Sequence, residues 1–363
     1  MPGKNSISTI FAFWEKTKIT NLFEVRNLMS AKTPEQNHLI IASSPHLRCH
    51  RTTTSVMGNV LIALLPIVIA TAFIYGCRVL LSVAVASITA ILAEFLIQKA
   101  MKRKQTIQDL SCIVTAVILV LNLPLDFPFW QLIVGTIFAI VVVKAAFGGL
   151  GQNFANPAVT TRIVLVSAFA SSFAKNSEPL ARALHLSNSV MDSSSSATVL
   201  VLLKAGTDSN ELCTLRDLFF GIQRTTAIGE TCAIAILLGG LYLLFRKIIK
   251  WYIPISYIGT VAVLSFLFGG FSIQFMLYHL FSGGLLFSAF FMATDYTTSP
   301  LTNKGKFIFG IGLGILTSII RFWSNLPEGV SFAILTMNIL TPHIDRFTKE
   351  KPFGTEFNKQ TDL

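Results

Sequence analysis

The stretch VMGNVLIALLPIVIATAFIYG, residues 56–76, decides the class of fold. It contains no charged residue, and as a helix rising about 1.5 Å per residue it is long enough to cross about 30 Å of hydrocarbon. Similar runs recur along the chain. The sequence predicts about ten of them, at roughly 56–76, 79–98, 108–123, 128–148, 155–173, 227–245, 253–271, 273–293, 305–323 and 327–342. We therefore expect an all-α polytopic membrane protein.

The composition favours the same class. Of the 363 residues, 52% are hydrophobic and only 13% are charged. A single soluble core cannot bury that much apolar surface, so lipid is an expected partner of the chain. The N-terminal residues before Thr52 are polar and basic and lack the apolar core of a signal peptide, so we expect them to stay in the cytoplasm.

The net charge of +11 has a topological explanation. With a cytoplasmic N-terminus and ten crossings, 22 of the 29 Lys and Arg residues fall on the cytoplasmic side, among them Lys144 and Arg162, while Arg321 falls outside. This excess follows the positive-inside rule and predicts that both termini are cytoplasmic. The basic character therefore does not indicate nucleic-acid binding.

One long polar connection separates the predicted spans into two sets of five. We expect a cytoplasmic N-terminal segment at 1–52, a first transmembrane half at 53–173, an extracytoplasmic loop at 174–226, a second transmembrane half at 227–345 and a cytoplasmic tail at 346–363. An odd number of spans in each half predicts two inverted five-helix repeats. The third span is short, and the eighth carries the double glycine of HLFSGGLLFSAFFMATD, so we expect shortened or broken helices around a central site.

Carboxylates inside or beside the spans are candidates for function, because a charge in lipid is costly. Glu94 lies well inside the second span, where either an ion-path role or a paired structural carboxylate is consistent with the sequence. Glu230, Asp295 and Asp345 lie near span ends, where a solvated or helix-capping carboxylate is expected.

Cysteines predict no metal site in this chain, and the sequence indicates no catalytic residue. The five cysteines are scattered without a C-x-x-C pair, at Cys49, Cys77, Cys112, Cys213 and Cys232. We therefore expect isolated thiols, neither a zinc site nor an iron–sulfur cluster.

A glycine-rich turn, FGGLGQNFANPAV at 147–159, supplies Asn153, Asn156 and Pro157 at the predicted cytoplasmic mouth of the fifth span. Glycine would let the backbone approach a flat ligand, and the Asn side chains could bond the imide edge of an isoalloxazine ring. A tight turn with helix-capping Asn and Pro explains the same residues. Both interpretations remain open.

The polar loop contains DSSSSAT, residues 192–198. It fits the pattern D-x-x-[ST]-[GS]-A-T through Asp192, Ser195, Ser196, Ala197 and Thr198. On this pattern, membrane-bound flavoproteins carry FMN linked through its phosphate to the Thr hydroxyl. A flexible polar linker is the alternative. The charge count puts Thr198 outside the cytoplasm, where the transferase that attaches the flavin works.

Beyond this pattern, the chain from about His38 to Asp345 resembles the D subunits of the Rnf ion-translocating electron transport complexes, and is similar to the B subunits of the Na⁺-translocating NADH:quinone reductases. The resemblance is carried by the glycine-rich turn, the flavin pattern, IASSPH (41–46), AIGETCAIAILLGGLYLL (227–244), FFMATDYTTSP (290–300) and LPEGVSFAILTMNIL (326–340). Ser194 and Ser196 depart from the commoner residues of the pattern.

The resemblance implies a membrane subunit of an ion-translocating ferredoxin:NAD⁺ oxidoreductase in the bacterial cytoplasmic membrane, inactive without its partner subunits. It implies covalent FMN on Thr198, attached by a flavin transferase, and a non-covalent riboflavin near Asn153, Asn156 and Pro157. It also implies that Glu94, Asp295 and Asp345 line a path for Na⁺ or H⁺. The alternatives are a quinone-reductase subunit, a secondary transporter without a redox role and a structural scaffold.

Overall fold

A computed structural model of the chain describes residues 52–103, 105–173, 199–204, 215–221, 227–324 and 329–349. The first half contains α2 (Thr53–Tyr75), α3 (Arg78–Ala100), η1 (Ile107–Asp109), α4 (Ser111–Leu121), α5 (Phe129–Ile137), the π-helix η2 (Phe138–Ala145), α6 (Pro157–Ala168) and α7 (Ala170–Phe173). Two short helices follow, α9 (Val199–Lys204) and α10 (Leu215–Phe220). The second half contains η3 (Ile228–Glu230), α11 (Ala233–Phe245), α12 (Tyr252–Phe268), α13 (Ile273–Phe281), α14 (Leu285–Phe287), the π-helix η4 (Ser288–Met292), α15 (Asn303–Trp323) and α16 (Val330–Thr348).

Helix α2 illustrates why the apolar runs form membrane helices. The Thr52 side chain caps its N-terminus by accepting a hydrogen bond from the Ser55 amide at 3.2 Å. Both faces of the helix are apolar. The inward face buries Ala63, Leu64, Ile67 and Val68, and the outward face exposes Ile62, Leu65, Ile69 and Phe73. An apolar outward face is costly in water, so we assign it to lipid.

Helix lengths bear on the predicted spans. Within the described ranges, three helices are long and apolar enough to cross a membrane: α2, α3 and α15. Helix α13 and the segment 285–292 pass the same test together as one span, bent by 61°. Shorter apolar helices or α16 occupy the other predicted positions. The all-helical expectation is therefore confirmed for the described residues, whereas the ten crossings and the inverted repeat stay predictions.

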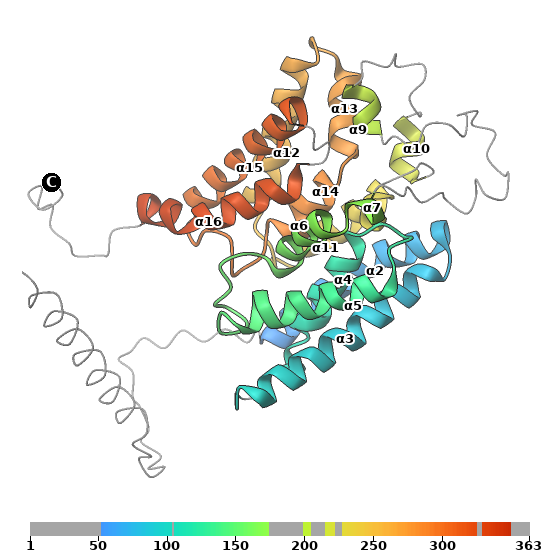
Figure 1. The fold of residues 1–363 in the computed structure, drawn as a ribbon. Helices are drawn as coiled ribbons and strands as arrows, with labels where there is room; N and C mark the ends of the chain where they lie inside the picture. The colour runs from blue at the N-terminus through green and yellow to red at the C-terminus, as the bar shows by residue number, and fades with distance from the viewer. Residues whose placement is uncertain are drawn as a thin grey trace, which may run out of the picture. The chain divides into compact units, whose positions relative to one another are not determined.

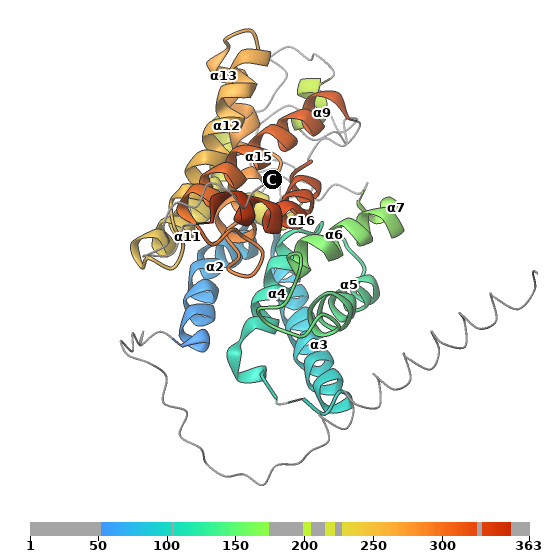
Figure 2. The ribbon, with the colours of Figure 1, turned by 90° about the vertical axis from the view of Figure 1, so that its left-hand side faces the viewer.

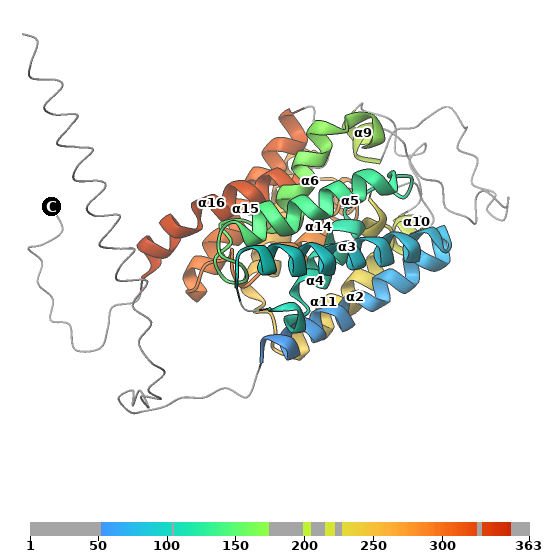
Figure 3. The same cartoon turned by 60° about the horizontal axis from the view of Figure 1, so that its bottom comes forward.

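The helices form two groups (Figure 1, Figure 2 and Figure 3). Helices α2 to α6, coloured blue to green, lie together, and helices α12 to α16, coloured orange to red, lie together. Helix α11 packs against α2, α6 packs against α16, and the short η3 contacts α2 and α4, so these elements join the two halves of the chain. The candidate site is built mainly on α3, α4 and η2 of the first half.

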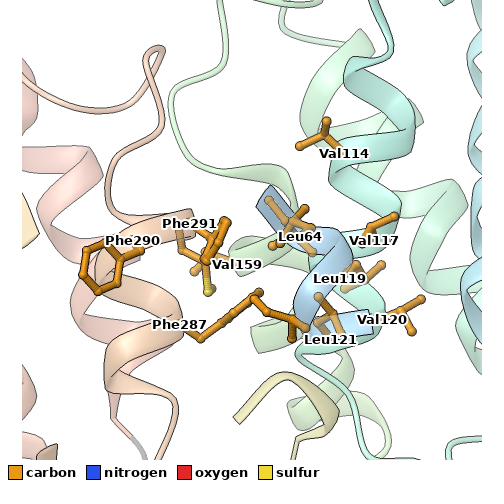
Figure 4. Packing of buried hydrophobic residues seen from close by; sticks show 14 of the residues in the cluster. Leu64, Val114, Val117, Leu119, Val120, Leu121, Val159, Phe287, Phe290 and Phe291 are labelled. Carbon is orange, nitrogen blue, oxygen red and sulfur yellow. The ribbon is translucent and has the colours of Figure 1, made fainter. Parts of the chain in front are cut away.

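The core between the two groups combines aliphatic and aromatic side chains. Figure 4 shows Leu64, Leu121 and Val159 of the first group gathered near Phe287 and Phe291 of the bent span. All five are buried. Because the surrounding lipid is as apolar as these side chains, close packing rather than water exclusion holds the groups together.

Because of this close packing, replacement by alanine should have very different effects on stability at two glycines in helix interiors. Gly239 of α11 abuts the Ala63 carbonyl oxygen of α2, leaving no room for a Cβ, whereas a Cβ on Gly259 of α12 meets nothing within 4 Å. We expect Gly239→Ala to destabilise the chain by roughly 1–3 kcal/mol through overpacking. Gly259→Ala should be neutral or slightly stabilising, since Ala favours the helix. Thermal unfolding of the two variants in detergent tests this, and equal stabilities would contradict it.

Candidate functional site

Glu94 lies at the centre of a buried polar cluster. Its side chain is 3% exposed and accepts hydrogen bonds from the Lys144 ammonium, at 3.0 Å to Oε1 and 2.9 Å to Oε2. Lys144 also donates to the Ser111 hydroxyl at 2.8 Å, so that all three of its N–H groups have acceptors. Lys144 is itself buried. Glu94 is thus paired with a buried lysine, and this pairing is compatible with both roles that the sequence left open.

Two further side chains hold the carboxylate in place. Gln98 Nε2 donates to Glu94 Oε1 at 3.0 Å, and Thr106 Oγ1 donates to the same oxygen at 3.1 Å. Gln98 and Thr106 also bond each other. Lys144 belongs to the π-helix η2, a form of helix that is often found at functional sites. The pair is therefore held by α3, α4, η2 and the segment before α4 together.

Two cavities meet at Lys144. The larger, of about 330 Å³, is lined by Glu94, Gln98, Arg103, Thr106 and Asp109, among others. The smaller, of about 80 Å³, is lined by Ser111, Asn153, Asn156, Pro157 and Asp295, among others. Lys144 and Leu150 line both cavities. The structure therefore brings the glycine-rich turn, Asp295 and the partner of Glu94 to one place.

The glycine-rich turn supports the capping interpretation for two of its residues. Asn156 Oδ1 caps α6 by accepting from the Ala158 amide at 3.0 Å, and its Nδ2 donates to the Met292 carbonyl at 3.2 Å. Pro157 occupies the first position of α6. Asn156 thereby ties the start of α6 to the end of η4.

Asn153 is the member of the turn with unused bonding capacity. It is buried, and its Oδ1 has no hydrogen-bond partner among the described residues. That oxygen could accept a bond from a ligand. However, ligand pockets usually measure about 300–1,000 Å³. The cavity of about 80 Å³ is too small to enclose an isoalloxazine ring as described.

Asp295 lies in the turn after η4, beyond the end of the bent span. Its Oδ2 accepts from Thr297 Oγ1 at 3.0 Å and from Thr298 Oγ1 at 3.4 Å. Burial raises the pKa of this carboxyl group, and the bonds from Thr297 and Thr298 act in the opposite direction. Asp295 itself is half-buried. The carboxylate borders the smaller cavity and is accessible to a small ligand there.

Asp345 does not join the other candidates. It lies near the end of α16, where Oδ1 accepts from the Leu301 amide at 3.0 Å. It lines neither of the two cavities. Its observed role is to tie α16 to the segment before α15.

Glu230 was expected to be a solvated or a helix-capping carboxylate, and it is not solvated, because it is buried. Its Oε1 lies 3.9 Å from the Arg162 guanidinium, which also donates to the Ser331 hydroxyl at 2.8 Å. Glu230 also lies against Gly284 at the break in the bent span. This ionic contact joins η3, α6 and α16 across the two groups of helices.

Arg321 holds the break in the bent span. Its side chain is 3% exposed, and its guanidinium donates to the carbonyls of His279, Ser282 and Gly283 at 2.6, 3.2 and 3.1 Å. Gly283 has φ +69°, which favours glycine. The broken helix would otherwise leave these carbonyls without donors inside the membrane. The predicted interruption at the double glycine is therefore confirmed.

Lys144, Arg162 and Arg321 were missed as internal groups, because charge counting assigned them to the two membrane surfaces. All three are buried. A signal was present for Lys144, which directly follows the valines of AIVVVKAA. The flavin-pattern residues Asp192, Ser195, Ser196, Ala197 and Thr198 lie outside the described residues.

These features define a helical membrane protein in which ionisable side chains are buried between apolar helices and line internal cavities. Residues 40–354 match the profile of the NQR2, RnfD, RnfE family. The chain belongs to this family.

Three relatives illustrate the similarity. The chain is 43% identical to the D subunit of the Na⁺-translocating ferredoxin:NAD⁺ oxidoreductase complex of Acetobacterium woodii, over 89% of this chain and 98% of that protein. It is 39% identical to the D subunit of the proton-translocating ferredoxin:NAD⁺ oxidoreductase complex of Clostridium ljungdahlii, over 88% and 98%. It is 36% identical to the D subunit of the ion-translocating oxidoreductase complex of Pseudomonas aeruginosa, over 86% and 95%. The named ions differ, so similarity alone does not identify the ion for this chain.

Proposed function

We propose that this chain is the D subunit of an ion-translocating ferredoxin:NAD⁺ oxidoreductase complex. In this role it relays electrons through FMN held as a phosphoester on Thr198, and it couples their passage to movement of Na⁺ or H⁺. The observation that carries the proposal is the similarity to ferredoxin:NAD⁺ oxidoreductase D subunits along nearly the whole chain, together with the flavin pattern at 192–198. The partners are the other subunits of that complex.

The proposed division of labour follows from the chemistry of the residues. FMN supplies the capacity to accept and donate electrons singly or in pairs. The Thr198 hydroxyl provides the attachment atom, and Asp192 with Ser195 and Ser196 forms the segment that the transferase recognises. A covalent tether keeps the flavin at high effective concentration near its partners. The rest of the chain provides the membrane core through which the ion moves.

Glu94 and Asp295 are the carboxylates we assign to the ion path. Support comes from the two cavities that they line and from Lys144, which borders both. A carboxylate lowers the desolvation cost of a cation inside the membrane. We leave Asp345 out of this path, because it bonds a backbone amide and lines neither cavity.

We also propose that the two halves are inverted repeats of five spans. Support comes from recurring neighbour relations, since α3 packs against α4 and α5 as α12 packs against α13 and α15. The contacts between α2 and α11, and between α6 and α16, join equivalent spans of the two halves. Such an arrangement would place ion sites between the repeats.

The riboflavin implied near Asn153 has weaker support than FMN. The free Oδ1 of Asn153 suits a ligand donor, but Asn156 and Pro157 already cap α6. A ring would also require the small cavity to widen. We therefore assign no step to a second flavin.

Flavin attachment tests the proposal directly. The chain is expressed with and without an FMN transferase, and the denatured protein is examined by in-gel fluorescence and peptide mass analysis. We expect a transferase-dependent FMN adduct on Thr198. An unmodified peptide from correctly inserted protein would reject the flavin assignment and favour a secondary transporter.

A further inference from the structure

We propose that the Lys144 ammonium is a tethered substitute for an alkali metal cation at Glu94, and that its withdrawal admits Na⁺ or a similar ion to that position. This inference rests on the ion path proposed above. It adds the class of ion and the group that controls its entry. Lys144 thereby occupies the position until the ion takes its place, and Glu94 is the group that holds the ion.

The geometry around the ammonium resembles a cation site. Three oxygens surround Nζ, at 3.0 Å from Glu94 Oε1, 2.9 Å from Glu94 Oε2 and 2.8 Å from Ser111 Oγ. Hard cations prefer oxygen ligands, and a single positive charge balances the single carboxylate. An ammonium group and an alkali ion therefore meet the same requirements at this position.

The location of Lys144 suits control of entry. Its side chain lines both cavities, whereas Glu94 borders only the larger one and Ser111 only the smaller one. Through its bonds to Glu94 and Ser111, the Lys144 side chain thus lies where the linings of the two cavities overlap. A flexible four-carbon side chain can leave this position while its backbone stays in place.

Arg103 is also positively charged and lines the larger cavity. Its guanidinium donates to the Ala145 carbonyl at 3.1 Å, at the end of η2, so Lys144 is the cation that bonds Glu94. Glu94 accepts further bonds from Gln98 and Thr106, which fix its oxygens when Lys144 leaves. Without Lys144, the buried carboxylate would lose its charge partner, which favours entry of another cation.

The test uses the assembled complex with Lys144→Met, in NaCl or in N-methyl-D-glucamine chloride of equal ionic strength. We expect Na⁺ to raise the thermal midpoint of this variant by several degrees over the bulky organic cation, because binding to the folded state stabilises it. The wild type should show a smaller difference. In sealed vesicles without electron donor, ²²Na⁺ entry should rise about tenfold, a barrier change of about 1.4 kcal/mol.

Two variants separate the cation site from a structural ion pair. Glu94→Gln/Lys144→Met removes both charges. It should lose the Na⁺-specific stabilisation and the raised ²²Na⁺ entry of Lys144→Met. Lys99→Met, at an exposed lysine of α3, should behave as the wild type. Equal responses of Lys144→Met to the two cations would overturn the proposal. So would failure of Lys144→Met to assemble in Na⁺ while the double variant assembles.

Flavin on Thr198 and ferredoxin-dependent NAD⁺ reduction are measured on the same preparations. If both are present in the wild type but Lys144→Met shows no cation effect, only the inference about Lys144 fails. If the wild type carries no flavin and does not reduce NAD⁺, the proposed function fails independently.

Discussion

Thr198→Ala is expected to remove all covalently bound flavin while leaving the membrane helices folded. The substitution deletes the only hydroxyl that the pattern assigns to the phosphoester. Thr198 lies in the polar connection between the two sets of apolar segments, so its loss removes no predicted membrane segment. In the assembled complex, ferredoxin-dependent NAD⁺ reduction should fall at least a hundredfold, and in-gel fluorescence should be lost with it, because a diffusing flavin lacks the effective concentration of a tethered one.

Ser194→Ala is the matched control for this prediction. Ser194 lies in the same serine run but at an unrestricted position of the pattern. If the segment is a flexible linker, the two substitutions should have the same small effect. If Thr198 is the attachment residue, Ser194→Ala keeps its fluorescence. Flavin retained on the denatured Thr198→Ala chain would reject the assignment.

Arg321→Met should be among the most destabilising single substitutions in the membrane core. It leaves the carbonyls of His279, Ser282 and Gly283 without their guanidinium donor, at about 1–3 kcal/mol for each buried acceptor. No water is present in the hydrocarbon to replace these bonds. We expect a sharp loss of folded protein in detergent, measured by size exclusion after stepwise heating.

Arg78→Met serves as the comparison. Arg78 pairs with Asp126 at 3.4 Å, with both side chains more than 40% exposed, so its removal should cost no more than about 1 kcal/mol. Arg321→Lys keeps the charge but loses the planar guanidinium fork, so its stability should lie between those of Arg321→Met and Arg78→Met. If Arg321→Met were as stable as Arg78→Met, the guanidinium would not be what holds the break.

Helix positions were largely predictable, because apolar composition is a local property of the sequence. The run predicted at 273–293 coincides with α13 and the segment 285–292, and its double glycine lies at the 61° bend. Glycine is the residue that adopts positive φ without strain, which is why the break could be located in advance.

The partners of the buried charges were not predictable. Lys144 and Glu94 are 50 residues apart, and Arg162 and Ser331 are 169 apart. A charge count along the sequence treats every lysine and arginine as solvated. Burial of these groups depends on a distant partner, and one chain without relatives aligned to it contains no local sign of that partner. The same limit explains why Glu94 could not be assigned to either of its two roles.

Leu200 of α9 sets a limit on how far a flavin on Thr198 could travel. Its buried side chain packs against Gly283 beside the Arg321 guanidinium, and α9 is also fastened by a bond from Lys204 to the Ser324 carbonyl. Two residues of extended chain span at most about 7 Å. Apart from the length of its own ribityl phosphate, the cofactor would therefore stay within a short radius of the helix break, and the subunits that exchange electrons with it would have to dock near that point.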